Sequence, residues 1–148
     1  KNDRIKNHTI YFLSGHKDNI FYKIINKTAD ANIVYENDYV CCFEDIEPVA
    51  PIHILIVPKK YIKSMNTITK EDEKYLSEIL LSANHIANIK NIGESGYRLI
   101  TNCNYDGGQE IDYLHFHLVG GCRLGKMISL PKESKKKMKE LKDLNEKT

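Results

Sequence analysis

The segment from residue 111 to residue 119 (Ile-Asp-Tyr-Leu-His-Phe-His-Leu-Val) constrains the fold more than any other part of the chain. Side chains on a strand alternate between its two faces, so one face receives Tyr113, His115 and His117. The opposite face receives three apolar side chains: Leu114, Phe116 and Leu118. The sequence therefore predicts a strand with one core face and one face that gathers two imidazoles, whose Cα atoms lie about 7 Å apart.

Four further strands are predicted before this segment. Apolar and β-branched runs bounded by turn residues predict strands at residues 33–36, 39–45, 53–57 and 97–103. Asn37 and Asp38 form a tight-turn pair between the first two of them. The run at 53–57 is apolar after its first residue, which is typical of a strand covered on both faces.

Two helices complete the predicted architecture. Residues 19–27 predict a short amphipathic helix with Ile20, Phe21 and Ile24 on one face. A capping-box pattern at residues 69–72 predicts the start of a long helix with apolar positions 76, 79, 80, 83, 86 and 87, and Gly93 as its stop. Residues 104–108 predict a loop with unusual backbone angles. The fold class is α+β, with a mainly antiparallel five-stranded sheet and two helices.

Size and charge restrict the class of protein. A chain of 148 residues predicts one domain, and no apolar run reaches the roughly 18 residues that a membrane-spanning helix needs. The formal net charge is +2, while residues 132–148 carry seven lysines and four acidic residues, which gives +3 and leaves the body near −1. We therefore expect neither a membrane nor a nucleic acid as partner, and a tail that is a solvated helix or a disordered end. Four cysteines without a CxxC spacing predict reduced thiols in an intracellular protein.

Three interpretations of the His115–His117 pair remain open at the level of residues. The pair is structural if it lies on an exposed sheet surface. It holds zinc if a third ligand such as His53 joins it. It is catalytic if one imidazole attacks phosphorus while its neighbour holds the phosphate oxygens. The preceding Asp-Gly-Gly-Gln-Glu segment at 106–110 favours the last interpretation, because two glycines let backbone N–H groups approach an anion closely.

The same segment resembles the signature of the histidine-triad (HIT) superfamily. It is most similar to the Hint branch, the nucleoside phosphoramidases once described as protein kinase C inhibitors. The similarity continues in order through segments at residues 21–27, 33–38, 43–46, 50–53, 57–60, 96–98 and 102–109, and it covers about residues 19–124. We therefore expect an N-terminal extension at 1–18, a HIT domain at 19–125 and a lysine-rich tail at 126–148. The resemblance also implies a homodimer in which the sheets of two protomers join into one.

The resemblance implies a role for each matched position. His115 corresponds to the nucleophile that forms a nucleotidyl-histidine, and His117 to the histidine that contacts the phosphate. His53 matches a histidine near the site, for which a core role and a catalytic role both remain open. The implied nucleotide-binding positions are Asp45 for the ribose hydroxyls, Ile33, Tyr35 and Ile46 for the base, and Asn102, Gly108, Gln109 and Glu110 for the phosphate.

Two positions depart from the family's pattern. Tyr113 stands at the first position of the triad, where the family has His. Because the family uses the backbone carbonyl there to fix the tautomer of the nucleophile, we expect Tyr113 to modify the site without abolishing it. Glu110 stands where Hint-type proteins commonly have Ser, and its carboxylate either assists as an acid or base or repels the phosphate.

The resemblance implies hydrolysis of purine nucleoside 5′-phosphoramidates, such as adenosine 5′-monophosphoramidate, with no required cofactor. Departure of the amine needs a proton donor, for which protonated His117 or His115 itself is a candidate. Hydrolysis of dinucleoside polyphosphates, nucleotide binding with little turnover, and zinc-dependent regulation are the alternatives. We expect the protein in the cytoplasm, with the nucleus left open as a second compartment.

Overall fold

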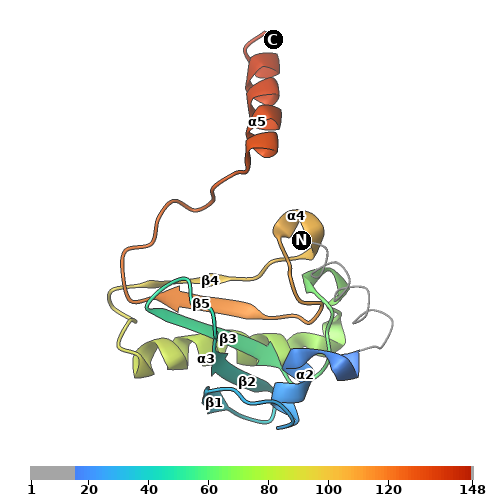
Figure 1. The fold of residues 1–148 in the computed structure, drawn as a ribbon, viewed down its shortest axis with the longest axis vertical. Helices are drawn as coiled ribbons and strands as arrows, with labels where there is room; N and C mark the ends of the chain where they lie inside the picture. Colours follow the sequence, from blue (N-terminus) through green and yellow to red (C-terminus); the bar gives the residue numbers. More distant parts are fainter. Residues whose placement is uncertain (1–15, 148) are drawn as a thin grey trace.

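The computed structural model describes residues 16–147 and contains one five-stranded sheet (Figure 1). The strands are β1 (Ile33–Glu36), β2 (Val40–Glu44), β3 (Ile52–Pro58), β4 (Tyr97–Ile100) and β5 (Phe116–Gly120). Their order across the sheet is β1-β2-β3-β5-β4, and every neighbouring pair is antiparallel. The predicted fold class is therefore confirmed.

The described residues form four α-helices and three short 3₁₀ helices. The α-helices are α2 (Ile20–Ile25), α3 (Glu73–Ile89), α4 (Asn104–Gly107) and α5 (Lys132–Asn145). The 3₁₀ helices are η1 (His16–Asp18), η2 (Met65–Thr67) and η3 (Lys70–Asp72). The two predicted helices correspond to α2 and α3, while α4 is a single turn and α5 stands away from the sheet at the end of an extended segment (Figure 1). None of these helices is both long and apolar enough to cross a bilayer.

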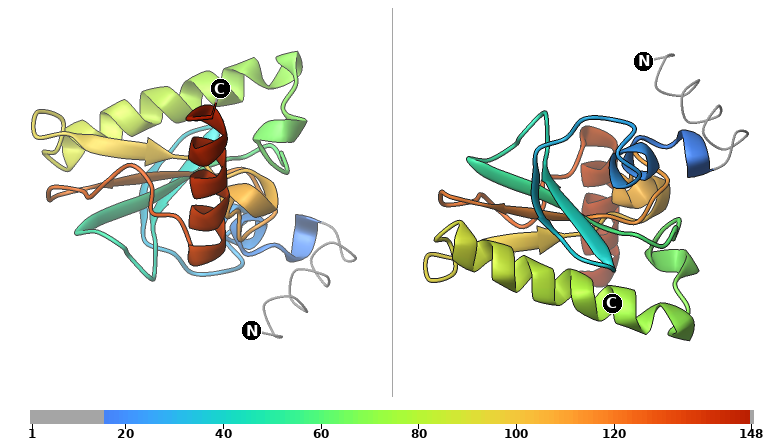
Figure 2. Two further views of the ribbon diagram at one scale, coloured as in Figure 1. Left: turned by 90° about the horizontal axis from the view of Figure 1, so that it is seen from above. Right: turned by 90° about the horizontal axis from the view of Figure 1, so that it is seen from below.

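Each face of the sheet is covered by a different helix, as Figure 2 shows. On the α3 face, alternate residues of β2, β3 and β5 pack with the helix: Val40, Cys42, Ile54, Ile56, Leu118, Ile79, Ala83 and Ile86. On the α2 face, the intervening residues pack with the shorter helix: Cys41, Phe43, Leu55, Val57, Phe21, Ile24 and Tyr113. The adjacent cysteines are thus buried on opposite faces with unpaired thiols. Burial raises the pKa of Cys41 to about 11, so that thiol stays protonated and unreactive at neutral pH.

The helix boundaries and buried faces differ from the prediction in four places. The Thr69–Asp72 capping box is present, but it begins η3, and α3 follows at Glu73. Leu80 is exposed, because successive helix residues are 100° apart and Ile79 points at the sheet. The left-handed residue after α3 is Asn91, with φ of 57°, rather than Gly93. In α2, Phe21 and Ile24 are buried while Ile20 is exposed.

The last two strands are shorter than predicted. β4 ends at Ile100, so residues 101–103 lie outside the sheet, and β5 begins only at Phe116. Before it, the chain pairs with the segment that follows β3, where the Leu114 N–H donates to the Ile62 carbonyl at 2.7 Å. The alternation of faces nevertheless holds, since Tyr113 packs on the α2 face and Leu114 on the α3 face.

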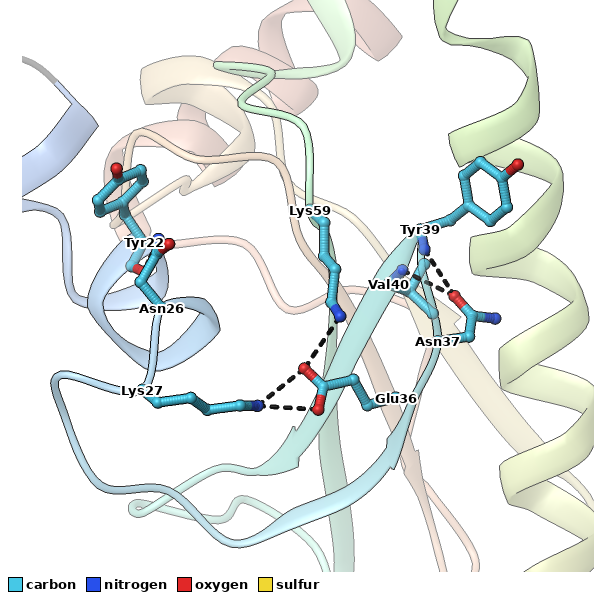
Figure 3. Close-up of polar contacts among 8 residues, drawn as sticks. All are labelled: Tyr22, Asn26, Lys27, Glu36, Asn37, Tyr39, Val40 and Lys59. Carbon is cyan, nitrogen blue, oxygen red and sulfur yellow. Dashed lines mark hydrogen bonds and ion pairs between the residues drawn. The ribbon is translucent and has the colours of Figure 1, made fainter.

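The β1–β2 turn forms where the Asn37-Asp38 pair predicts it (Figure 3). The Asn37 side-chain oxygen accepts hydrogen bonds from the N–H groups of Tyr39 and Val40, at 2.8 and 3.0 Å. Beside this turn, the Glu36 carboxylate lies between Lys27 and Lys59, with shortest N–O distances of 2.8 and 3.1 Å. The paired charges lower the pKa of Glu36, chiefly through the hydrogen bond from Lys27, and keep a charged group on the edge strand.

Candidate active site

His115 is held in one orientation on the α2 face. Its Nδ1 lies 2.6 Å from the Tyr113 carbonyl oxygen, which can only accept, so Nδ1 carries the proton and donates it. The Nε2 atom therefore presents a lone pair. The Thr101 hydroxyl donates to the His115 carbonyl at 2.9 Å, and Phe21 packs edge-on against the imidazole at 5.0 Å. Although residues 111–115 are not a strand, the local geometry places this imidazole beside that of His117, 5.0 Å away.

His53 and His117 form a hydrogen-bonded pair next to His115. The Val49 N–H donates to His53 Nδ1 at 3.1 Å, so the proton of neutral His53 is on Nε2. That Nε2 lies 2.8 Å from His117 Nδ1, which then accepts, and 3.4 Å from an Asp45 carboxylate oxygen. Since its Nδ1 accepts, neutral His117 carries its own proton on Nε2. The hydrogen-bond pattern thus assigns a tautomer to each of the three histidines.

The site favours uncharged imidazoles. Burial lowers the pKa of His115 and of His53, and Asp45 offsets only part of that effect. The pKa of His117 falls to about 4, first because of burial and then because charge on His115 or His53 would repel it. At neutral pH all three rings are therefore uncharged. The lone pairs of His53 and His117 already accept hydrogen bonds, whereas the lone pair of His115 is on Nε2. A protonated His117 would also place a second donor against His53, so the expectation of His117 as the acid for amine departure loses support.

The nucleotide positions predicted after β2 lie at the rim of this group. Asp45 follows β2 directly, and one of its oxygens accepts from the Glu47 N–H at 2.9 Å. Ile46 is 91% exposed and lies next to Asp45 in the chain, so its side chain remains available to a ligand. Its carboxylate lies 3.4 Å from His53 Nε2, a contact that the predicted role of Asp45 in ribose binding does not require.

The predicted base-pocket residues of β1 are separated by an irregularity in the strand. Ile33 pairs with Phe43 and packs on the α2 face, where the histidines lie. A register shift between Ile33 and Tyr35 turns Tyr35 to the α3 face, where its ring contacts His85 at 4.9 Å. The structure thus corrects the placement of Tyr35 beside Ile33 in one pocket.

The loop before the histidines has the backbone angles that its composition predicts. Gly108 has φ of 77° and ends the single-turn helix α4, which begins at Asn104 with φ of 57°. Such angles favour glycine and asparagine, which explains these residues here. Asn102 lies just before this turn, between β4 and α4. Glu110 is exposed, and its charge offsets a part of the lowering that burial causes in the pKa of His115, so it lies within electrostatic reach of that ring.

Gln109 corrects a prediction, because its side chain points into the protein. The amide nitrogen donates to the carbonyls of Lys63 and Ile111, each at 2.9 Å, and the amide oxygen accepts from the Asn104 N–H at 3.0 Å. Both donors of the amide are thus engaged, and the side chain is buried. Gln109 fixes the shape of the loop and does not offer its side chain to a phosphate.

Comparison with known proteins agrees with this geometry. A family model described as "Scavenger mRNA decapping enzyme C-term binding" matches residues 18–127. The purine nucleoside phosphoramidase of Escherichia coli (strain K12) is 44% identical over 113 residues, which cover 76% of this chain and 95% of the relative. The chain belongs to the histidine-triad family.

Solved structures show that this HIT protein has the family's fold. A HIT family hydrolase from Legionella pneumophila Philadelphia 1 has a TM-score of 0.73 and 38% identity, covering 74% of this chain and 98% of the other. A histidine triad protein from Clostridium difficile has a TM-score of 0.72 and 42% identity, covering 75% and 96%. The fold of the HIT protein is therefore shared by solved structures with substantial sequence identity.

One group of residues in this HIT protein has the composition of a metal site. Asp45, His53 and His117 each offer one ligand atom, all within 4.8 Å of one another. The sequence suggested His53 beside the histidine pair as a zinc ligand but did not reveal Asp45, which lies eight residues before His53 and follows another strand. The assigned tautomers oppose a metal there, because His53 Nε2 carries the proton that His117 Nδ1 accepts. A metal would have to displace that hydrogen bond.

Three contacts of the site were not predicted. Phe21 contacts His115 from α2, Thr101 holds the His115 carbonyl, and the Val49 N–H orients His53. The Phe21 position was predicted only as part of a helix face. The other two contacts carry no local pattern, because a single hydroxyl and a backbone N–H in a turn gain their roles only from the tertiary structure.

Proposed function

We propose that this protein hydrolyses purine nucleoside 5′-phosphoramidates through a nucleotidyl-histidine intermediate on His115. The observation that carries the proposal is the hydrogen bond from His115 Nδ1 to the Tyr113 carbonyl. It leaves the Nε2 lone pair for attack on phosphorus, in a buried ring that stays neutral at physiological pH. The 44% identity to a purine nucleoside phosphoramidase supports a hydrolase with this class of substrate.

The reaction proceeds in two displacements. His115 Nε2 attacks the α-phosphorus, an N–P bond forms to the imidazole, and the P–N bond to the amine breaks. The departing amine takes up one proton. The Nδ1 proton remains on His115 and keeps its hydrogen bond to the Tyr113 carbonyl, which stabilises the positive charge of the adduct.

Water completes the cycle. It attacks the same phosphorus, the His115 N–P bond breaks, and the nucleoside 5′-monophosphate leaves. This step returns the proton that the first consumed, so the sum is one phosphoramidate plus one water giving one monophosphate and one amine. The Glu110 carboxylate is exposed and acts electrostatically on His115, so it is our candidate for the group that exchanges these protons with water.

The other polar residues bind the substrate. His117, with its proton on Nε2, donates to a phosphate oxygen as a neutral imidazole, and His53 keeps it in that tautomer. The ribose hydroxyls donate to Asp45, whose carboxylate has lone pairs beyond the one that Glu47 uses. Ile46 and Ile33 contact the base. We expect no metal to take part, because the hydrogen bond from His53 Nε2 to His117 Nδ1 already occupies two of the atoms that would bind it.

The test is an adenosine 5′-phosphoramidate with a fluorescent amine, assayed with wild type, His115→Ala and the control His85→Ala. His85 is an exposed histidine on α3, on the opposite face of the sheet. We expect His115→Ala to lose on the order of 10³-fold or more in turnover and His85→Ala to match wild type. Rapid-quench mass spectrometry should find the nucleotidyl adduct on His115. Turnover that survives His115→Ala would overturn the proposal.

The same assay separates the alternatives. Preferential cleavage of diadenosine polyphosphate would assign the protein to dinucleoside polyphosphate hydrolysis. Binding of AMP without turnover of either substrate would assign it to nucleotide binding alone. Loss of activity with a chelator, restored by zinc, would assign a metal role to the Asp45–His53–His117 group.

A further inference from the structure

Two tyrosines connect the chain segment before His115 to the segment after β3. The Tyr113 hydroxyl donates to the Pro58 carbonyl at 2.6 Å, and the Tyr61 hydroxyl donates to the Asp112 carbonyl at 3.0 Å. The two hydrogen bonds run in opposite directions, and the rings contact edge-to-face at 5.2 Å. We refer to Tyr61 and Tyr113 as the tyrosine clamp.

The clamp lies where the sheet no longer holds the chain. Residues 111–115 precede β5, so no ladder of strand hydrogen bonds fixes them. Besides the clamp, they are tied to the 58–63 segment by the Leu114 N–H and by the Gln109 amide, which also binds the Ile111 carbonyl. The peptide unit that carries the Tyr113 carbonyl is therefore held by one backbone hydrogen bond, from the Leu114 N–H to the Ile62 carbonyl, and by the side-chain contacts of the clamp.

We propose that the tyrosine clamp is the positioning device of the nucleophile, holding the Tyr113 carbonyl against His115 Nδ1. This inference rests on the proposed function only for its kinetic consequence, because the orientation of His115 is measurable without substrate. It also gives a role to the Tyr at the first position of the triad, where the side chain acts through the backbone and makes no contact with the reacting atoms.

The chemistry of the phenol suits this task. Tyr113 is 1% exposed, so its hydroxyl needs a partner inside the protein, and the Pro58 carbonyl, at the end of β3, supplies it. Burial raises the pKa of Tyr113 far above neutrality, so the hydroxyl remains a donor over the working pH range. A histidine at this position would titrate near neutral pH, whereas the phenol does not.

Loss of the clamp should free the carbonyl to move. Without the hydroxyl of Tyr113, the buried Pro58 carbonyl loses this donor, and the chain before β5 loses one of its hydrogen bonds to the 58–63 segment. His115 would then sample the other tautomer, with the proton on Nε2 and no lone pair directed at phosphorus. Fewer molecules would hold a competent nucleophile, which lowers kcat and leaves KM nearly unchanged.

The experiment uses the full chain with Tyr113→Phe, Tyr61→Phe and the double variant, and Tyr75→Phe as control. Tyr75 lies on α3 and packs edge-on against Tyr39, outside the site. Phenylalanine keeps each ring and removes only the hydroxyl. Histidine ¹⁵N chemical shifts report the tautomer of His115, and the fluorescent phosphoramidate reports kcat and KM.

We expect wild type and Tyr75→Phe to show His115 with its proton on Nδ1. Each clamp variant should lower kcat roughly fivefold with little change in KM, and the double variant should lower it further and show a mixture of tautomers. If the double variant fails to fold, the single variants carry the test. An unchanged tautomer in folded clamp variants would overturn the clamp, whether or not turnover falls. A wild type without turnover would overturn the proposed function and leave the tautomer measurement to decide on the clamp.

Discussion

The three histidines of the site stay neutral chiefly because they are buried, and a chain of hydrogen bonds through two of them acts in the same direction. The Val49 N–H, His53 and His117 form consecutive donor–acceptor pairs, so any added proton breaks one of them. This hydrogen-bond geometry opposes protonation in the same direction as burial, which lowers the pKa values of His53 and His117. An unfolded histidine has its pKa near 6.5.

This difference predicts a pH-dependent stability. Between about pH 6.5 and the folded pKa of His117 near 4, the unfolded chain binds protons that the folded chain does not, so acid favours unfolding. The free energy of unfolding should be fully present above pH 6.5 and should decline as the pH falls through this window. Urea unfolding at several pH values measures it. His117→Gln should reduce the slope, and equal slopes in both proteins would contradict the assignment.

At the residue scale, His53 can also be tested as an orienting group. His53→Ala removes the donor to His117 Nδ1, so His117 can take the wrong tautomer, and turnover should fall about tenfold. His53→Gln retains a side-chain N–H donor and should keep more of the activity. The comparison requires kcat of both variants on the fluorescent phosphoramidate. Equal activity of the alanine and glutamine variants would assign His53 to the core alone.

At the scale of elements, α3 and α5 differ in what they contribute. α3 buries five residues, among them Ile79 at 0% exposure, while no residue of α5 is buried. The lysine-rich segment thus forms the solvated helix that was one of the two sequence expectations. Its position away from the sheet explains why it adds nothing to the core (Figure 1).

Two alanine variants measure this difference. Ile79→Ala leaves a cavity between α3 and the sheet and should lower the free energy of unfolding by about 3 kcal/mol. Leu141→Ala on α5 removes a similar side chain that is 53% exposed and should change it by less than about 0.5 kcal/mol. Chemical denaturation of both variants gives the two values. A comparable loss in Leu141→Ala would mean that α5 packs against the body.

For the whole molecule, the sheet order leaves β1 and β4 with one unpaired edge each. Unpaired edges invite further strand pairing. The edge strand β1 carries the Glu36 charge cluster, which disfavours it as an interface (Figure 3). α3 presents Leu80, Leu81 and Ile89 to solvent. The symmetric dimer that joins two sheets beside the long helix stays a prediction, for which β4 and these exposed side chains of α3 form the candidate interface.

Sedimentation equilibrium at micromolar concentration tests this expectation. We expect a mass of twice 17.1 kDa. Leu81→Asp should shift the protein toward the monomer, because Leu81 on α3 is 62% exposed and would be covered in the dimer. Leu144→Asp on α5, where the side chain is 65% exposed, is the matched control and should leave the mass unchanged. A wild-type mass of 17.1 kDa would contradict the dimer.

Local patterns were sufficient for much of this structure. The positions of β1, β2 and β3, the existence of α3 and the two faces of the 113–118 segment all follow from alternation or helical spacing, since these depend on residues close in sequence. The ends of β4 and β5 were not predictable in this way. They depend on whether a partner strand or the 58–63 segment receives the backbone hydrogen bonds.

By itself, the sequence determined that His115 and His117 share one side of the chain opposite an apolar side. It also determined that the loop before them has a glycine, Gly108, where a positive φ is needed. Only the tertiary structure decided which nitrogen of each ring carries the proton, that Asp45 meets His53, that Gln109 turns inward, and that Tyr35 leaves the site. The physical reason is the range of the interactions. Period and backbone angle are properties of neighbouring residues, whereas hydrogen bonds between strands and a register shift in β1 exist only once distant segments have been brought together.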